Sequence, residues 1–193
     1  MPKRLPQERR NQILKRARLC IAADIGYSLG GGSSDPRSPS PADETDNCDC
    51  SAFVCWVLGL KKLSPFLWLR HVNGGWLNTN GIYWDARFEP TGVFEWVRHG
   101  TQGTNGVEWK DEIWPSDVIV YPGSSTHFPK PIGKIPKIGH VGIVSEVTEN
   151  EPTQIIHCSA GNERKLGYAI AETPPVAFLA QPSTIVARCM LLP

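Results

Sequence analysis

A cysteine at the start of a predicted helix is the residue in this sequence best placed to act as a nucleophile. Three of the six cysteines crowd into positions 48–55, which suits a metal site, a redox pair or a nucleophile with bystanders. The run 50–58 places its apolar side chains on one side and stops at Gly59, so we expect a short buried helix with Cys50 in its first turn. The N–H groups and dipole of a helix N-terminus favour a thiolate. Apolar surroundings indicate core positions for the cysteines at 20, 55 and 189.

A nucleophilic cysteine needs a base, and two histidines lie in segments with strand character. His140 begins a predicted strand over 140–147, and His157 lies inside another over 154–158. If these strands pair, both imidazoles can face the same side, where one can orient the other. Neighbouring residues of a strand point to opposite faces, so only one of His157 and Cys158 can face such a site.

The elements that must position these residues change type along the chain. Apolar residues at helical spacing predict a helix over 6–25, with a basic face that we interpret as solvated. Further strands are expected over 117–121 and 184–192, with a surface excursion at 122–139. Helices first and strands later indicate an α+β fold in which N-terminal helices pack on a central antiparallel sheet.

The stretch 61–115 holds six of the seven tryptophans among many glycines and asparagines, and has the character of an insertion. A short run at 93–98 that includes Glu95 looks helical and stops at His99-Gly100. We expect the tryptophans to fill a small satellite core, with a sugar- or peptide-binding groove as the alternative.

Composition bounds the class of protein. A chain of 193 residues suits a single domain spanning 1–193, and 40 % apolar residues suffice for a core. The 20 Lys and Arg residues nearly balance the 19 Asp and Glu residues, so we expect no nucleic-acid partner. No apolar stretch is long enough for a membrane span, and no signal peptide is apparent, so we expect synthesis in the cytoplasm and no membrane partner.

The segment 49–54, Asp-Cys-Ser-Ala-Phe-Val, resembles the Asp-Cys-Ser-Gly-Phe-Val motif of the NlpC-type, papain-like cell-wall cysteine peptidases. Four other segments resemble motifs of that family in the same order. They are Gly-Tyr-Ser-Leu-Gly-Gly at 26–31, Ser-Asp-Val-Ile-Val-Tyr at 116–121, Gly-His-Val-Gly-Ile-Val at 139–144 and Ile-His-Cys-Ser at 156–159.

The resemblance implies a papain-like fold and a catalytic triad of Cys50, His140 and His157, with no cofactor and no metal. Cys50 would attack a peptide carbonyl, His140 would carry the proton, and His157 would hold His140 in the right tautomer. Tyr27, Asp49 and Ser51 would shape the acyl-side pocket and bind the free amine of L-Ala. The implied substrate is a peptidoglycan stem peptide, cut between D-Glu and diaminopimelate.

Other functions stay open at this point. A related amidase would cut the muramyl–L-Ala bond, and a catalytically inactive relative would only bind the wall. A zinc module would use cysteines from 48–55 and Cys158 with a histidine, although no second Cys-x₂₋₄-Cys pair is present. Cys48 and Cys158 are expected to be free thiols, with a disulfide between them as the alternative.

A wall hydrolase made without a signal peptide needs a route to its substrate. Phage lysis, a phage tail or injection as a bacteriolytic type VI effector would bring it to the periplasmic or extracellular wall. Alternatively, it would act in the cytoplasm on imported muropeptides. The expected partner is peptidoglycan or a muropeptide, joined by an immunity protein if the chain is a secreted effector.

Overall fold

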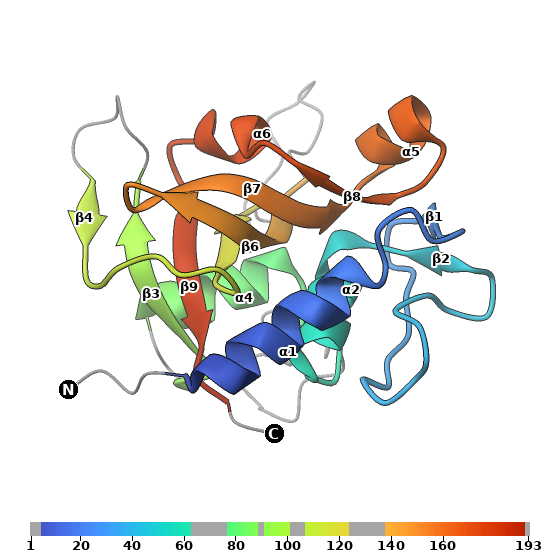
Figure 1. Ribbon diagram of the computed structural model, residues 1–193, viewed down its shortest axis with the longest axis horizontal. Helices are drawn as coiled ribbons and strands as arrows, with labels where there is room; N and C mark the ends of the chain where they lie inside the picture. Colours follow the sequence, from blue (N-terminus) through green and yellow to red (C-terminus); the bar gives the residue numbers. More distant parts are fainter. Residues whose placement is uncertain (1–4, 63–76, 89–90, 101–106, 124–137, 192–193) are drawn as a thin grey trace, which may run out of the picture.

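A seven-stranded antiparallel sheet forms the centre of the protein in a computed structural model that describes residues 5–62, 77–88, 91–100, 107–123 and 138–191 (Figure 1). The strand order is β4-β3-β9-β5-β6-β7-β8, and every neighbouring pair is antiparallel. The fold is therefore α+β with a large antiparallel sheet, as the order of predicted elements indicated. The strands are β3 (Phe94–His99), β4 (Glu108–Trp109), β5 (Val118–Tyr121), β6 (His140–Thr148), β7 (Glu151–Cys158), β8 (Ile170–Thr173) and β9 (Ile185–Cys189).

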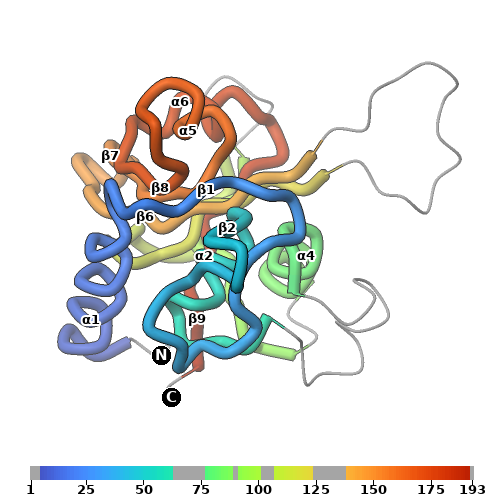
Figure 2. The backbone as a smooth tube through the Cα atoms, turned by 90° about the vertical axis from the view of Figure 1, so that its right-hand side faces the viewer, coloured from blue at the N-terminus to red at the C-terminus, as the bar shows by residue number. Residues whose placement is uncertain are grey.

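Helices cover both faces of this sheet. In Figure 2, α1 (Gln7–Arg18), α2 (Cys50–Leu58) and α4 (Thr79–Phe88) lie on one side, and α5 (Ala160–Leu166) and α6 (Val176–Leu179) lie on the other. A short parallel pair, β1 (Gly26–Tyr27) and β2 (Asn47–Cys48), precedes α2, so the chain runs from β2 almost directly into that helix. None of the helices in the described part of the chain has both the length and the apolar character needed to cross a lipid bilayer.

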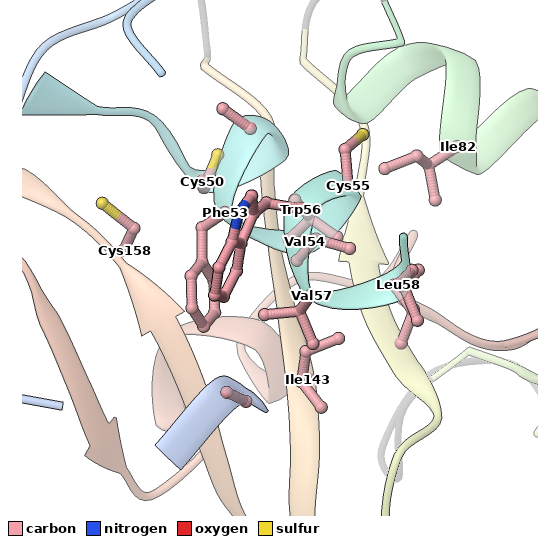
Figure 3. Packing of buried hydrophobic residues seen from close by; sticks show 14 of the residues in the cluster. Cys50, Phe53, Val54, Cys55, Trp56, Val57, Leu58, Ile82, Ile143 and Cys158 are labelled. Carbon is pink, nitrogen blue, oxygen red and sulfur yellow. The ribbon is translucent and has the colours of Figure 1, made fainter. Parts of the chain in front are cut away.

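Helix α2 is buried along its whole length and anchors the larger core (Figure 3). Its side chains pack against residues of β6 and β7 that face the same side, such as Val141, Ile143 and Ile156. The helix ends where predicted, at Gly59, whose positive φ of 74° forms a left-handed C-cap. Arg9 of α1 donates to the Leu58 carbonyl at 2.7 Å, which ties the two helices together.

Two predicted elements differ from the structure. The run 93–98 is not a helix: Phe94–His99 is strand β3, because it pairs with β9 and buries Phe94 and Val97 against the core. Pairing across the sheet outweighs the local helical pattern in so short a run. Helix α1 ends at Arg18 rather than near residue 25, and Ala22 at φ 58° interrupts the helical backbone.

The tryptophan-rich segment belongs to the main sheet, because it supplies β3 and β4. Trp84 and Trp109 are each 44 % exposed, Trp96 packs at the edge of the larger core, and Trp114 lies between the Arg10 and Arg188 guanidinium groups. These four rings therefore lie in separate surroundings rather than in one satellite core. Trp68 and Trp76 lie outside the described residues.

Candidate active site

Cys50 is the first residue of α2, as the sequence predicted, and Asp49 fixes that helix start. The Asp49 carboxylate accepts a hydrogen bond from the Ala52 amide at 2.7 Å through Oδ1, so Asp49 is the helix N-cap. The same oxygen accepts from the Ser51 hydroxyl at 2.8 Å. Both predicted neighbours of the cysteine thus hold the first turn of the helix in place.

A buried lysine that the sequence analysis did not single out neutralises Asp49. Lys62 Nζ lies 2.9 Å from Asp49 Oδ2, and both side chains are almost inaccessible to solvent. Lys62 also donates to the Gly31 carbonyl at 2.8 Å, while the Gly30 amide donates to Asp49 Oδ2 at 3.0 Å. Together with Ser51 and Ala52, Lys62 and Gly30 give the Asp49 carboxylate four partners within the protein, so this carboxylate holds both the glycine-rich loop and the helix start.

In the glycine-rich loop before the cysteine, Gly32 packs too closely on α2 for a side chain. A Cβ at Gly32 would lie 2.3 Å from the Cβ of Ala52, and Gly32 has a φ of +113° that favours glycine. The loop therefore presses against the turn that carries Cys50. This contact explains why position 32 holds a glycine.

The two predicted histidines are hydrogen-bonded to each other. His140 Nε2 and His157 Nδ1 are 2.7 Å apart, across the antiparallel pair of β6 and β7. His157 Nε2 in turn lies 3.0 Å from the hydroxyl of Thr173 on β8. The two strands that carry the histidines thus pair, which was the condition for both imidazoles to face the same side, and the series of contacts continues from His157 to Thr173.

Aromatic packing restrains both imidazole rings. Phe178 of α6 stacks on His140 with ring centroids 5.0 Å apart and meets His157 edge-on at 5.9 Å. Tyr121 packs edge-on against Phe178 at 5.6 Å. A Cβ at Gly142 would lie 3.0 Å from that of His157, so glycine allows the His157 side chain to lie close to β6.

The thiol of Cys50 lies at the start of β6, beside the residue that follows His140. The Val141 backbone forms a hydrogen bond with the Cys50 thiol that favours the thiolate. Two tyrosines are close enough to Cys50 for a thiolate there to raise their pKa: Tyr27 and Tyr121. The thiol of the predicted nucleophile thus lies beside Val141, the sequence neighbour of the predicted base His140, with Tyr27 and Tyr121 within electrostatic range.

Burial keeps the site uncharged in the free protein. Desolvation, followed by the charge of Asp49, raises the pKa of Cys50 to about 12. Desolvation also lowers the pKa of His140 to about 3, with a contribution from His157, and lowers the pKa of His157 to about 4. The backbone of Ser51 in the first turn of α2 favours the thiolate, as expected of a helix N-terminus, but burial outweighs this effect. A neutral thiol can still act as a nucleophile when a neutral imidazole accepts its proton during the attack.

The other thiols have structural surroundings. All six cysteines are free and buried. Cys158 lies against the end of β2, where its thiol donates to the Cys48 carbonyl at 3.3 Å. His157, the neighbouring residue of β7, is on the opposite face of that strand and contacts His140. Within the described ranges, no three His, Cys, Asp or Glu side chains are arranged to hold a metal ion. Cys48 and Cys158 are free thiols in this structure.

A cavity of about 480 Å³ lies beside the histidine pair, between β7, β8, α5 and α6. Its lining includes His157, Thr173 and Phe178, with Asn162 and Lys165 from α5. Asn162 is buried and donates to the His157 carbonyl at 3.1 Å, which holds the backbone of that strand. The cavity thus lies next to His157 and Thr173, the two residues of the hydrogen-bonded series that follow His140.

No known family model matches the chain, and none of the curated proteins is similar enough in sequence to count as a relative. The interpretation of the site therefore depends on its own contacts. These include residues that sequence reasoning missed, namely Lys62, Tyr121, Thr173 and Phe178. Tyr121 lay within a quoted motif, but the others stand outside every motif.

Proposed function

We propose that the protein is a papain-like cysteine peptidase of the NlpC type that hydrolyses peptidoglycan stem peptides, cutting the γ-D-glutamyl–diaminopimelate bond. The observation that carries the proposal is the 2.7 Å contact between His140 and His157 at the end of β6 where the Cys50 thiol lies. A nucleophile at a helix start, a base beside it and an orienting group behind the base are the parts of a hydrolytic triad. The five motifs in family order supply the substrate class.

In the proposed reaction, His140 takes the thiol proton as Cys50 Sγ bonds to the substrate carbonyl carbon. The carbonyl oxygen becomes an oxyanion, and we assign its stabilisation to the backbone amide of Cys50 in the open first turn of α2. Collapse of this intermediate breaks the C–N bond, and the leaving amine takes the proton from His140. Water then gives a proton to His140 and attacks the thioester, which releases the carboxylic acid and returns the proton to Cys50.

On the acyl side, the roles of Tyr27, Asp49 and Ser51 are unequal. Asp49 Oδ1 is bound by Ser51 and Ala52, and Oδ2 by Gly30 and Lys62, so this carboxylate is compensated within the protein. We therefore assign Asp49 and Ser51 to holding the nucleophile, and Tyr27 to contacting the substrate.

The compensated Asp49 favours a second candidate function. A carboxylate already paired with Lys62 offers little extra attraction to the free amine of an L-Ala terminus. Substrates in which that nitrogen is still acylated by muramic acid fit such a pocket as well. An N-acetylmuramoyl-L-alanine amidase would use the same three catalytic residues on the neighbouring amide bond.

Mass spectrometry of purified sacculi and soluble muropeptides, incubated with the protein and with the Cys50→Ala variant, separates these functions. Fragments that end in L-Ala–D-Glu and require Cys50 would support the endopeptidase. A muramic acid with a free lactoyl end would identify the amidase instead. Binding to sacculi with no Cys50-dependent product would refute both and leave a wall-binding module.

A further inference from the structure

The histidine pair does not end at His157, because the hydroxyl of Thr173 lies 3.0 Å from His157 Nε2. Thr173 is the last residue of β8, and its hydroxyl also donates to the Pro174 carbonyl at 3.4 Å. A threonine hydroxyl has one proton and can accept from other groups. The use of that proton on Pro174 leaves the oxygen as an acceptor toward His157.

We propose that Thr173 is a positioning residue that sets the tautomer of both histidines and thereby leaves His140 Nδ1 unprotonated for the reaction. Thr173 accepts the proton of His157 Nε2, so His157 Nδ1 carries a lone pair. This lone pair accepts the Nε2 proton of His140, 2.7 Å away. His140 Nδ1 is then the free base. In the reverse arrangement Thr173 would donate to His157 Nε2, so His157 would carry its proton on Nδ1 and donate it to His140 Nε2. The proton of His140 would then be on Nδ1, and this nitrogen could not act as the base.

The sheet holds Thr173 in this place. His157 pairs directly with Ala171 in the β7–β8 register, and Thr173 lies two residues further along β8, on the same face. The residue before a proline is confined to extended backbone, so Pro174 restricts Thr173 where it meets His157. Phe178 packs edge-on against the His157 ring and limits its rotation.

Each histidine ring carries one proton at neutral pH. Burial lowers the pKa of both His140 and His157 well below 7. A neutral imidazole has one N–H and one lone pair, so a single acceptor at the end of the chain decides both tautomers.

The test combines a spectroscopic and a kinetic measurement on the full chain. Long-range ¹H–¹⁵N NMR at pH 7 reports which ring nitrogen of each histidine is protonated. We expect Nε2–H for both rings in the wild-type protein and in Thr173→Ser, and a mixture of tautomers in Thr173→Val. Thr173→Val should lower kcat by about 10–100-fold with little change in KM, as other orienting partners of functional histidines do, and Thr173→Ser should restore it.

A matched control is Thr153→Val on β7, because the Thr153 hydroxyl has no hydrogen-bond partner among the described residues. This variant should change neither the tautomers nor kcat. Protonation of His140 at Nδ1 in the wild-type protein would overturn the inference, and so would a Thr173→Val variant with wild-type tautomers.

The kinetic part depends on the proposed function, but the NMR part does not. A protein that hydrolyses no wall peptide but shows the expected tautomers, and their change in Thr173→Val, refutes the peptidase and supports the role of Thr173. If the protein is a peptidase but its histidine tautomers are the same in Thr173→Val as in the wild type, the role of Thr173 is refuted and the proposed function stands.

Discussion

Two buried polar clusters lie on the same sheet and are built in opposite ways. Arg188 of β9 carries a permanent charge, and its guanidinium group contacts Asp117 at 2.9 and 3.0 Å, Asp111 at 2.6 Å and the Glu112 carbonyl at 2.7 Å. The chain from His140 through His157 to Thr173 is neutral, and one contact of 2.7 or 3.0 Å joins each pair of neighbours. The Arg188 guanidinium group thus has four hydrogen bonds to its neighbours, whereas a single hydrogen bond joins His140 to His157 and another joins His157 to Thr173.

This difference separates a structural role from a chemical one. Two carboxylates and a carbonyl compensate the charge of Arg188, which also packs on the Trp114 ring at 3.8 Å, and no rearrangement of its protons is available. Each histidine can exchange its donor and acceptor nitrogens with a small change in geometry. Variants of the first cluster should therefore affect folding, whereas variants of the second should affect turnover.

The largest effect is expected for Cys50→Ala, which removes the nucleophile. Turnover of wall peptides should fall by at least ~10⁴-fold, because a triad without its nucleophile keeps only binding and oxyanion stabilisation. Cys20→Ala is a matched control, since both thiols are 4 % exposed in the same core and only one lies at the helix start. Mass spectrometry of muropeptide products checks both variants, and measurable turnover by Cys50→Ala would contradict the triad.

Arg188→Met should produce the next largest effect, on stability rather than on chemistry. It leaves Asp117 buried without its partner, which typically costs about 3–5 kcal/mol of unfolding free energy. Urea denaturation measures this loss, and the double variant with Asp117→Asn should recover part of it. The kcat of the folded protein should stay near the wild-type value. A fall in kcat at unchanged stability would place this cluster in the reaction.

His157→Ala tests the orienting role with a smaller expected loss. We expect kcat to fall by about 10–100-fold while KM changes little, since His140 remains but is no longer held in one tautomer. His157→Asn should lose less, because an amide oxygen can still accept from His140 Nε2. Steady-state kinetics on a soluble muropeptide compares the two. Equal losses would mean that His157 acts through packing alone.

The parts of the fold and site that sequence could predict are those encoded locally. Helix α2 begins with an Asp cap and ends with a glycine, and both signals lie within a few residues of the elements they bound. The runs around His140 and His157 are rich in β-branched residues, which predicted β6 and β7. The placement of Cys50 in the first turn followed from the apolar run 50–58 and its stop at Gly59.

The parts that sequence could not predict depend on distant contacts. Lys62 follows another lysine and has the pattern of a solvated surface, yet the glycine loop and Asp49 enclose it. Thr173 reaches His157 only through the β7–β8 register, which no local pattern specifies. Strand β3 was predicted as a helix because its partner, β9, lies about ninety residues further along the chain. Burial, another result of distant contacts, outweighs the effect of the helix start on the pKa of Cys50.

The neutral histidine pair also predicts how stability changes with pH. Folding lowers the pKa of His140 from 6.5 to about 3 and that of His157 from 6.5 to about 4, so between these values the unfolded chain binds more protons than the folded one. The stability present above pH 6.5 should therefore be lost as the pH falls, by about 1 kcal/mol for each histidine near pH 5.5. Urea denaturation between pH 8 and pH 5 measures this slope. The double variant His140→Gln with His157→Asn should show a shallower slope, because neither substituted side chain titrates. An unchanged slope in that variant would mean that other groups cause the loss and that the imidazoles are not held neutral by burial.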